Sequence, residues 1–218
     1  MAKTTKWMTL LLIIAVVTSV FLIVGVIKSG AELGFDHALN QWVLSIFTEG
    51  SHPIFQVITK LGDTIGIAIV VFIILVWLGV KKRDFTGMVI LVLAVALGNE
   101  MSKWLKEVVG RERPETAGAA ESLSFPSGHA MVGLILYFIL SYLLISTSKS
   151  LTLKWGIAII SFIIVLLIGI SRIVLQDHHP TDVLGGFALG IIWSILWVTL
   201  YNVVYSRLGA RRMKSREE

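Results

Sequence analysis

The stretch Trp7–Ile27, WMTLLLIIAVVTSVFLIVGVI, contains no charged side chain. A helix of about 20 apolar residues spans the hydrocarbon core of a bilayer, which is about 30 Å thick. The stretch is longer than the apolar core of a signal peptide, and no A-x-A cleavage site follows it. We therefore interpret it as a retained membrane anchor.

Five more apolar runs of similar length follow along the chain. Together they predict an all-α, polytopic membrane protein with six transmembrane helices in one bundle, forming a single membrane-embedded domain over residues 1–218. The expected spans are residues 7–27, 63–80, 86–109, 127–145, 153–175 and 181–205. Asp63 is expected to cap the second span.

The composition excludes several other classes of protein. Of the 218 residues, 56 % are hydrophobic and only 15 % are charged, whereas about 25 % is usual for charged residues. A soluble domain of this size has too little interior to bury so much apolar surface. The chain has no cysteine, which excludes a disulfide framework and thiolate metal sites.

The 19 lysines and arginines are distributed unequally between the two sides of the expected bundle. If the N-terminus is cytoplasmic, seven lie outside and the larger remainder lies inside, so the positive-inside rule places both termini in the cytoplasm. The outer seven are Lys28, Lys60, Lys103, Lys106, Arg111, Arg113 and Arg172. The basic excess is thus an orientation signal and does not indicate nucleic-acid binding.

The link between the first two spans, residues 30–62, is too long for a turn. Its apolar residues recur at helical spacing, which predicts a helix lying in the outer membrane interface. They are Phe35, Leu39, Trp42, Val43, Ile46 and Phe47. Such a helix could guide a lipid headgroup into a site or simply cover the end of the bundle.

Three motifs place polar residues at the outer ends of the last four spans. They are Lys106-x6-Arg113-Pro114, Pro126-Ser127-Gly128-His129 and Ser171-Arg172-x5-His178-x3-Asp182. If these spans bundle, the three motifs meet on one face of the membrane.

The cations and helix ends in these motifs suit phosphoryl transfer. Lys106, Arg113 and Arg172 supply three positive charges, and arginine forks match the geometry of phosphate oxygens. Two helix N-termini direct free N–H groups to the same face, where Ser127 adds a hydroxyl donor and Gly128 permits a close backbone approach. Fixed positive groups of this kind stabilise the transition state of phosphoryl transfer.

Two histidines and a carboxylate complete the expected reaction. His178 and Asp182 are similar to histidine–carboxylate pairs in which the acid fixes the tautomer and raises nucleophilicity. His129 is expected to stay protonated and to give its proton to the departing alkoxide. One neutral and one charged histidine predict a bell-shaped pH profile that belongs to the coupled site.

The three motifs, in this order and with six spans, resemble the signature of the type 2 phosphatidic acid phosphatases. The resemblance covers essentially the whole chain. It implies a lipid phosphatase without metal or other cofactor that forms a phosphohistidine on His178, with His129 as the acid and Asp182 as the partner of His178. It assigns phosphate binding to Lys106, Arg113, Ser127, Gly128 and Arg172. The neighbouring His179 lacks the x3-Asp spacing.

The small size and six spans are similar to bacterial members of this family. We expect hydrolysis of phosphatidylglycerophosphate to phosphatidylglycerol at the outer face of the cell membrane, with undecaprenyl pyrophosphate and phosphatidic acid as alternative substrates. The expected partners are this lipid phosphate and the membrane lipids. No nucleic acid and no obligate protein partner is indicated.

Two other classes of function use the same residues. Metal-dependent hydrolysis would need His129, His178, His179 and Asp182 as ligands, but their spacing is not that of a metalloprotease and three nearby cations disfavour a metal. A non-catalytic anion- or lipid-binding membrane protein would use the cations but leaves the spacing of His178 and Asp182 unexplained.

Three further features have mainly structural interpretations. Glu100 lies deep in the third span, where an unpaired charge is costly, and it is expected to pair with Lys103, a role in catalysis or substrate entry being the alternative. Small residues on the sixth span predict close helix packing; they are Gly185, Gly186 and Gly190. Charged residues between the third and fourth spans predict a solvated loop or a mobile loop over the site; they are Arg111, Glu112, Glu115 and Glu121.

Overall fold

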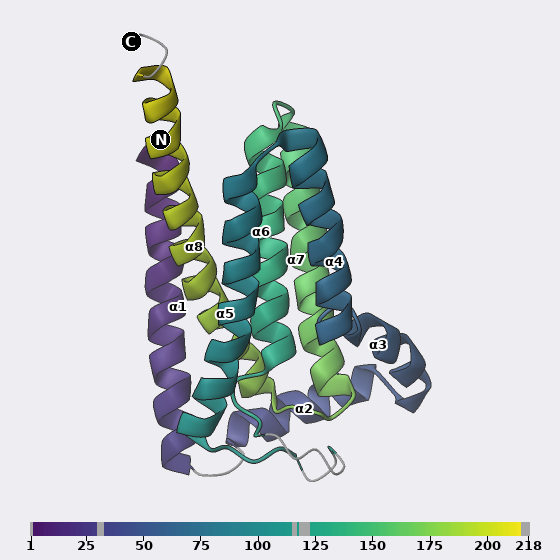
Figure 1. Cartoon of the computed structure of the whole chain (residues 1–218). Coiled ribbons are helices and arrows are strands. Elements are labelled where there is room, and N and C mark those ends of the chain that lie inside the picture. The colour runs from purple at the N-terminus through teal and green to yellow at the C-terminus, as the bar shows by residue number, and fades with distance from the viewer. Residues whose placement is uncertain (1, 30–32, 115–116, 118–122, 215–218) are drawn as a thin grey trace.

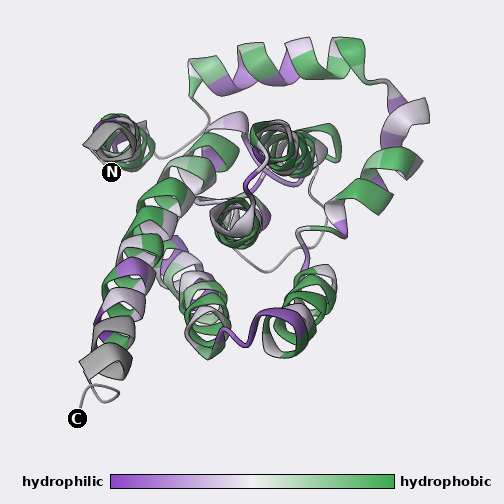
Figure 2. Cartoon of the chain, turned by 90° about the horizontal axis from the view of Figure 1, so that it is seen from above, coloured by the Kyte–Doolittle hydropathy of each residue, from purple (hydrophilic) through white to green (hydrophobic). Residues whose placement is uncertain are grey.

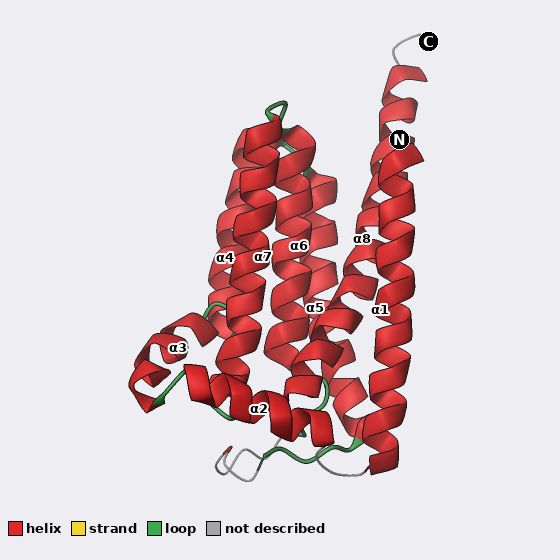
Figure 3. Ribbon diagram, turned by 180° about the vertical axis from the view of Figure 1, so that it is seen from behind, coloured by secondary structure: helices red, strands yellow, loops and turns green. Residues whose placement is uncertain are grey.

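The computed structural model describes residues 2–29, 33–114, 117 and 123–214, and these consist of helices and short connections without a strand (Figure 1, Figure 3). Six of the described helices are long and apolar enough to cross a membrane. They are α1 (Ala2–Ser29), α4 (Thr64–Trp77), α5 (Phe85–Val109), α6 (Gly128–Thr147), α7 (Leu151–Val174) and α8 (Pro180–Lys214). The six expected spans are confirmed.

Local signals in the sequence set where these helices begin. The carboxylate of Asp63 accepts a hydrogen bond from the Gly66 amide at 2.7 Å, so it caps α4 as expected. Asp84 caps α5 in the same way, and α4 continues towards it through one π-helical turn, Leu78–Lys82. Pro180 is the first residue of α8, where its missing N–H leaves no hydrogen bond unmade.

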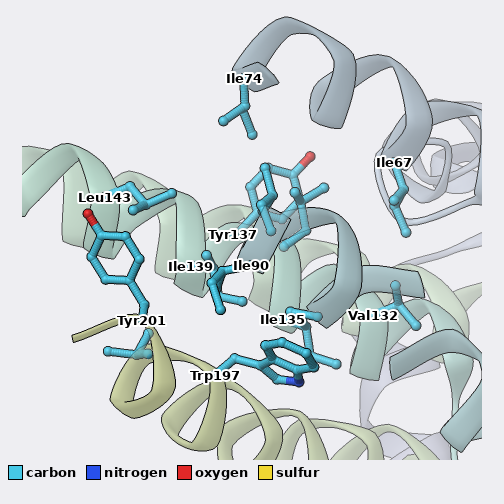
Figure 4. Packing of buried hydrophobic residues seen from close by; sticks show 14 of the residues in the cluster. Ile67, Ile74, Ile90, Val132, Ile135, Tyr137, Ile139, Leu143, Trp197 and Tyr201 are labelled. Atoms are coloured by element: carbon cyan, nitrogen blue, oxygen red, sulfur yellow. The ribbon is translucent and has the colours of Figure 1, made fainter. Parts of the chain in front are cut away.

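Helix α6 is the centre of the bundle and packs against α4, α5, α7 and α8, while α1 lies along α8 (Figure 1). The apolar cluster between these helices includes Ile135 and Ile139 of α6 and Trp197 of α8 (Figure 4). Lipid is as apolar as this core, so close van der Waals packing stabilises the bundle more than exclusion of water does.

Glycines allow α8 to approach α6 closely. A Cβ atom on Gly186 would lie 2.7 Å from the carbonyl oxygen of Ser127, and one on Gly190 would lie 3.0 Å from that of Met131. Gly185 likewise faces the ring of Phe125. The prediction that these three glycines serve helix packing is confirmed. Their contact fixes the first turn of α8 beside the start of α6.

The outward face of the bundle is covered by large apolar side chains. Phe21, Phe72 and Phe162 are each exposed over about two thirds or more of their surface. A continuous exposed surface of this kind is rare in proteins that face water on all sides, whereas it matches the hydrocarbon interior of a bilayer.

Helix α2 (Gly34–Ile46) lies across the end of the bundle opposite the start of α1 and the end of α8 (Figure 1). Hydrophilic and hydrophobic residues alternate along it (Figure 2), as expected for an interfacial helix. A short helix, α3 (His52–Thr59), follows after one 3-10 turn, Glu49–Ser51. The sequence pattern did not predict α3. Both helices pack on α7, so they border the end where the motifs lie.

Candidate active site

The three sequence motifs meet at the end of the bundle that α2 and α3 border. His129, at the start of α6, lies within electrostatic reach of Lys106, Arg113, Arg172 and His178. These residues come from the end of α5, the following loop, the end of α7 and the turn before α8. The expected convergence of the motifs is therefore present in the structure.

His178 and Asp182 form a buried pair at the start of α8. The Nδ1 atom of His178 lies 3.5 Å from Oδ2 of Asp182, and both side chains are almost completely buried. At this distance Nδ1 of His178 has no hydrogen-bond partner within the described residues. Asp182 accepts a hydrogen bond from the backbone N–H of His179 at 2.8 Å. The carboxylate thus contacts His178 through its ring and His179 through its backbone.

Burial sets the charge state of His178. The pKa of His178 is lowered to about 4, mainly by its removal from water, while the neighbouring Asp182 acts in the opposite direction. The positive charges of Arg113 and Lys106 contribute to the lowering. The imidazole of His178 is therefore neutral at pH 7, with Nδ1 towards Asp182.

Backbone carbonyl groups hold two of the predicted phosphate-binding cations in the site. Lys106 Nζ donates a hydrogen bond to the carbonyl oxygen of Leu123 at 2.6 Å. Arg113 Nη1 donates to the carbonyl oxygen of Asp177 at 3.1 Å. These hydrogen bonds fix the two side chains at the end of the bundle where the motifs meet.

Arg172 is oriented by two side chains. Its Nη2 lies 2.8 Å from a carboxylate oxygen of Asp177, and its Nη1 donates to the hydroxyl of Thr59, in α3, at 2.6 Å. Its Nε is buried and has no hydrogen-bond partner among the described residues. The Nε–H of Arg172 can thus donate to an acceptor that is not part of the described chain.

Ser127 presents a second donor of this kind. It is fully buried, and its hydroxyl has no partner within the part of the chain that the structure describes. Its backbone N–H donates to the carbonyl oxygen of Asp182 at 3.0 Å, which fixes the N-terminus of α6 beside the start of α8. Buried polar groups are rarely unpaired, so Ser127 and Arg172 together indicate that the site takes an acceptor-rich ligand.

Arg111 corrects the interpretation of the loop after α5. Instead of being solvated, it is only 4 % exposed, with Nη2 at 2.6 Å from Asp36 and Nη1 at 2.7 Å from Asp182. The backbone here is not helical, so Arg111 can turn inward, where two carboxylates compensate its charge. Glu112 is exposed as expected, and the corresponding expectations for Glu115 and Glu121 lie outside the described residues.

Sequence reasoning also missed the role of Asp36. This residue belongs to the interfacial helix, but it is completely buried. One signal could have found it. Asp36 shares a helix face with Leu39 and Val43, which pack inward, and an acid on an apolar face requires a buried partner.

A cleft of about 490 Å³ runs from the site between α4, α5 and α6. Lys106 and His129 line the end of the cleft nearest the site, and Val92 lines its far end, about 21 Å away along α5 at 1.5 Å per residue. Ala68 and Ala96, also in the lining, are exposed on the apolar face of the bundle, so the cleft opens sideways. The hydroxyl of Ser102 lines it as well, a residue that sequence reasoning missed.

The predicted ion pair of Glu100 and Lys103 is present. Lys103 Nζ lies 2.7 Å from Oε1 of Glu100, and both side chains are largely exposed. Lys103 also lines the cleft, one helical turn from Lys106.

The ligand set expected for a metal-dependent enzyme is not assembled, since no three His, Cys, Asp or Glu side chains of the described ranges gather into a metal site.

Residues 87–205, which contain all three motifs, match the family model of the PAP2 superfamily. The chain belongs to the PAP2 superfamily. Over 173 residues it is 32 % identical to phosphatidylglycerophosphatase B of Bacillus subtilis (strain 168), an alignment that covers 78 % of this chain and 85 % of that protein. The resemblance of the motifs to this family is thereby confirmed.

Two crystal structures share the PAP2 fold of this chain. A transmembrane PAP2-type phosphatidylglycerolphosphate phosphatase from Bacillus subtilis matches with a TM-score of 0.76 at 27 % identity, over 87 % of this chain and 96 % of that one. LpxE from Aquifex aeolicus matches with a TM-score of 0.60 at 24 % identity, over 77 % of this chain and 97 % of that one. This PAP2 chain is a multi-pass membrane protein and a phosphoric monoester hydrolase.

Proposed function

We propose that this PAP2 enzyme is a metal-independent lipid phosphatase that removes a terminal phosphate through a phosphohistidine on His178. One observation carries the proposal. The buried neutral imidazole of His178 lies within electrostatic reach of Lys106 and Arg113, and Lys106 and His129 line the head of a cleft that opens on the apolar face of the bundle.

The first half of the reaction transfers the phosphoryl group to the enzyme. The Nε2 lone pair of His178 attacks phosphorus, the bond from phosphorus to the ester oxygen breaks, and His129 gives its proton to the departing alkoxide. The dianionic ester supplies the counter-charge that a protonated His129 needs. Asp182 stabilises the positive charge that develops on the ring of His178.

Fixed donors bind the phosphoryl oxygens during this transfer. The proposed set is Lys106, Arg113 and Arg172 with the hydroxyl of Ser127 and the backbone N–H of Gly128. Their contribution is electrostatic, because they are already in place before charge develops on the transferring group.

The second half regenerates the enzyme. A water molecule attacks the phosphoryl group from the side of the departed alcohol, and His129, now neutral, takes its proton. The phosphorus–nitrogen bond breaks, inorganic phosphate leaves, and His178 returns to its neutral form. No step requires a metal or another cofactor.

The cleft supports a lipid as the substrate. It joins the phosphate-binding residues to apolar residues that lie about 21 Å deeper along α5, about two thirds of the thickness of the hydrocarbon core. A soluble phosphate ester would leave this apolar wall without a partner, whereas an acyl chain would fill it.

Polar residues in the cleft support phosphatidylglycerophosphate as the substrate. The name of the relative, phosphatidylglycerophosphatase B, supports the same lipid. Lys103 and Asn99 follow Lys106 along the same cleft wall, with Lys103 about 4.5 Å away along the helix axis. Phosphatidylglycerophosphate carries a second phosphate beyond a glycerol unit, which Lys103 would meet. Phosphatidic acid lacks this second phosphate, and in undecaprenyl pyrophosphate the two phosphates are directly joined.

The distribution of charge supports an active site at the outer membrane face. The basic links after α4 and α6 lie at the opposite end of the bundle from the motifs, and basic links remain on the cytoplasmic side. Both termini would then be cytoplasmic.

Phosphate release by the purified protein tests this proposal. Phosphatidylglycerophosphate, phosphatidic acid and undecaprenyl pyrophosphate are compared in the same detergent, with and without EDTA. We expect turnover of all three lipids, fastest with phosphatidylglycerophosphate, and no effect of EDTA. Loss of turnover in EDTA that a divalent ion restores would contradict the metal-free mechanism, and saturable binding without turnover would indicate the non-catalytic alternative.

A further inference from the structure

A buried chain of charged side chains connects the interfacial helix α2 to the candidate nucleophile. Asp36 of α2 accepts a hydrogen bond from Arg111 Nη2 at 2.6 Å, and Arg111 Nη1 donates to Oδ1 of Asp182 at 2.7 Å. Oδ2 of Asp182 faces His178. The side chains of Asp36, Arg111 and Asp182 are at most 2 % exposed.

The position of Arg111 fixes the orientation of Asp182. Arg111 holds Oδ1, while the Ser124 hydroxyl and the His179 N–H donate to Oδ2. A carboxylate held on both oxygens cannot rotate freely, so Oδ2 stays towards the ring of His178. Arg111 also places a positive charge 2.7 Å from Oδ1 of Asp182.

Asp36 is fully buried, and its hydrogen-bond partners are not among the proposed phosphate-binding residues. Besides Arg111, it accepts hydrogen bonds from the backbone N–H and the hydroxyl of Thr181, at 2.7 and 2.8 Å. Thr181 directly precedes Asp182. Asp36 therefore compensates the charge of Arg111 and fixes the first turn of α8, and both effects act on Asp182.

We infer that Asp36 and Arg111 are positioning residues, which act on the reaction through Asp182 and do not touch the phosphate. This inference rests on the proposed function of His178 and Asp182. It assigns the interfacial helix a part in catalysis, since its buried carboxylate holds the arginine that orients the partner of the nucleophile.

Two conservative variants test the inference. Asp36→Asn removes the negative charge and keeps the shape, and Arg111→Lys keeps the positive charge but cannot bridge two carboxylates as a guanidinium fork does. We expect kcat for phosphatidylglycerophosphate to fall about 10- to 100-fold, the range typical when the outer partner of an active-site group is lost. KM should change less than about twofold.

Vanadate binding separates positioning from a general loss of structure. Vanadate occupies phosphate sites, and its stabilisation of the protein can be followed by thermal unfolding in detergent without any turnover. We expect both variants to bind vanadate within about twofold of the wild type. The control is Asp84→Asn, the same change in a carboxylate at the opposite end of the bundle that caps α5 and accepts from Tyr201; its kcat should be unchanged.

The double variant tests whether Asp36 acts through Arg111. If it does, Asp36→Asn lowers kcat little further when Arg111→Lys is already present. Additive losses, loss of vanadate binding in parallel with kcat, or a kcat within twofold of wild type in both single variants would each overturn the inference. If Asp36→Asn does not fold, the kinetics of Arg111→Lys alone test the inference. If neither variant folds, Asp36 and Arg111 are required for folding and the inference is wrong. Absence of turnover by the wild type would instead contradict the proposed function.

Discussion

At the scale of single residues, the site combines a buried neutral imidazole with three nearby cations. His178 is neutral because burial opposes its protonation more strongly than Asp182 favours it. Lys106 and Arg113 each donate a hydrogen bond to a backbone carbonyl oxygen. A neutral imidazole can act as a nucleophile. The nearby cations stabilise the negative charge of the phosphoryl group that it would attack.

The pKa of His178 predicts a distinct pH dependence. The free enzyme should keep this imidazole neutral down to about pH 5, and folding stability should fall between pH 6.5 and 4, because the unfolded chain binds a proton there that the folded chain does not. NMR titration of 15N-histidine-labelled protein measures this directly. The resonance that His178→Gln removes should titrate near pH 4, and a midpoint at 6.5 or above would contradict the assigned burial.

Sequence motifs identified the residues that gather at the site, but not all of their contacts. Lys106, His129 and His178 stand out because their types and spacings suit one chemistry. Arg111 does not, because its partner Asp36 is 75 residues away in the chain and no local pattern connects them. Contacts of this range follow from how α2 docks, which a single sequence does not encode locally.

At the scale of elements, helix ends and one helix face account for most of the proposed chemistry. The N-termini of α6 and α8 meet at the site, joined by the hydrogen bond from Ser127 to Asp182. The spans were predictable because bilayer thickness fixes their length. Helix α3 was not, because a helix of 8 residues carries only two turns of pattern.

The cleft-lining face of α5 predicts a substrate-dependent effect of Lys103. Lys103→Gln should raise KM for phosphatidylglycerophosphate about two- to fivefold, the loss expected for one exposed charge pair, and should leave KM for phosphatidic acid unchanged. Steady-state kinetics on both lipids measure this. Lys28→Gln, the same change at the end of α1, is the control. An equal rise in KM for both lipids would show that Lys103 does not contact the second phosphate.

At the scale of the whole molecule, the basic links that orient the protein and the candidate active site lie at opposite ends of the bundle. The start of α1 and the end of α8 lie at one end, and α2, α3 and the motifs lie at the other (Figure 1). The apolar composition predicted six spans in one bundle, but it could not predict that α6 is central. That arrangement depends on close contacts such as the one between Gly186 and Ser127.

The chain has no cysteine, so single cysteines can report its orientation in the membrane. In intact cells, Glu112→Cys, at an exposed position after α5, should react with a membrane-impermeant maleimide. Lys149→Cys, between α6 and α7, should react only after the membrane is opened. The reverse pattern would place the active site on the cytoplasmic side.

Trapping of the phosphoenzyme tests the central claim most directly. The purified protein is mixed with phosphatidylglycerophosphate labelled with 32P in its terminal phosphate, and the reaction is stopped within milliseconds. We predict an acid-labile, base-stable phosphoprotein in the wild type and in His179→Ala, and none in His178→Ala. Label that persists in His178→Ala and disappears in His179→Ala would contradict the assignment of His178 as the nucleophile.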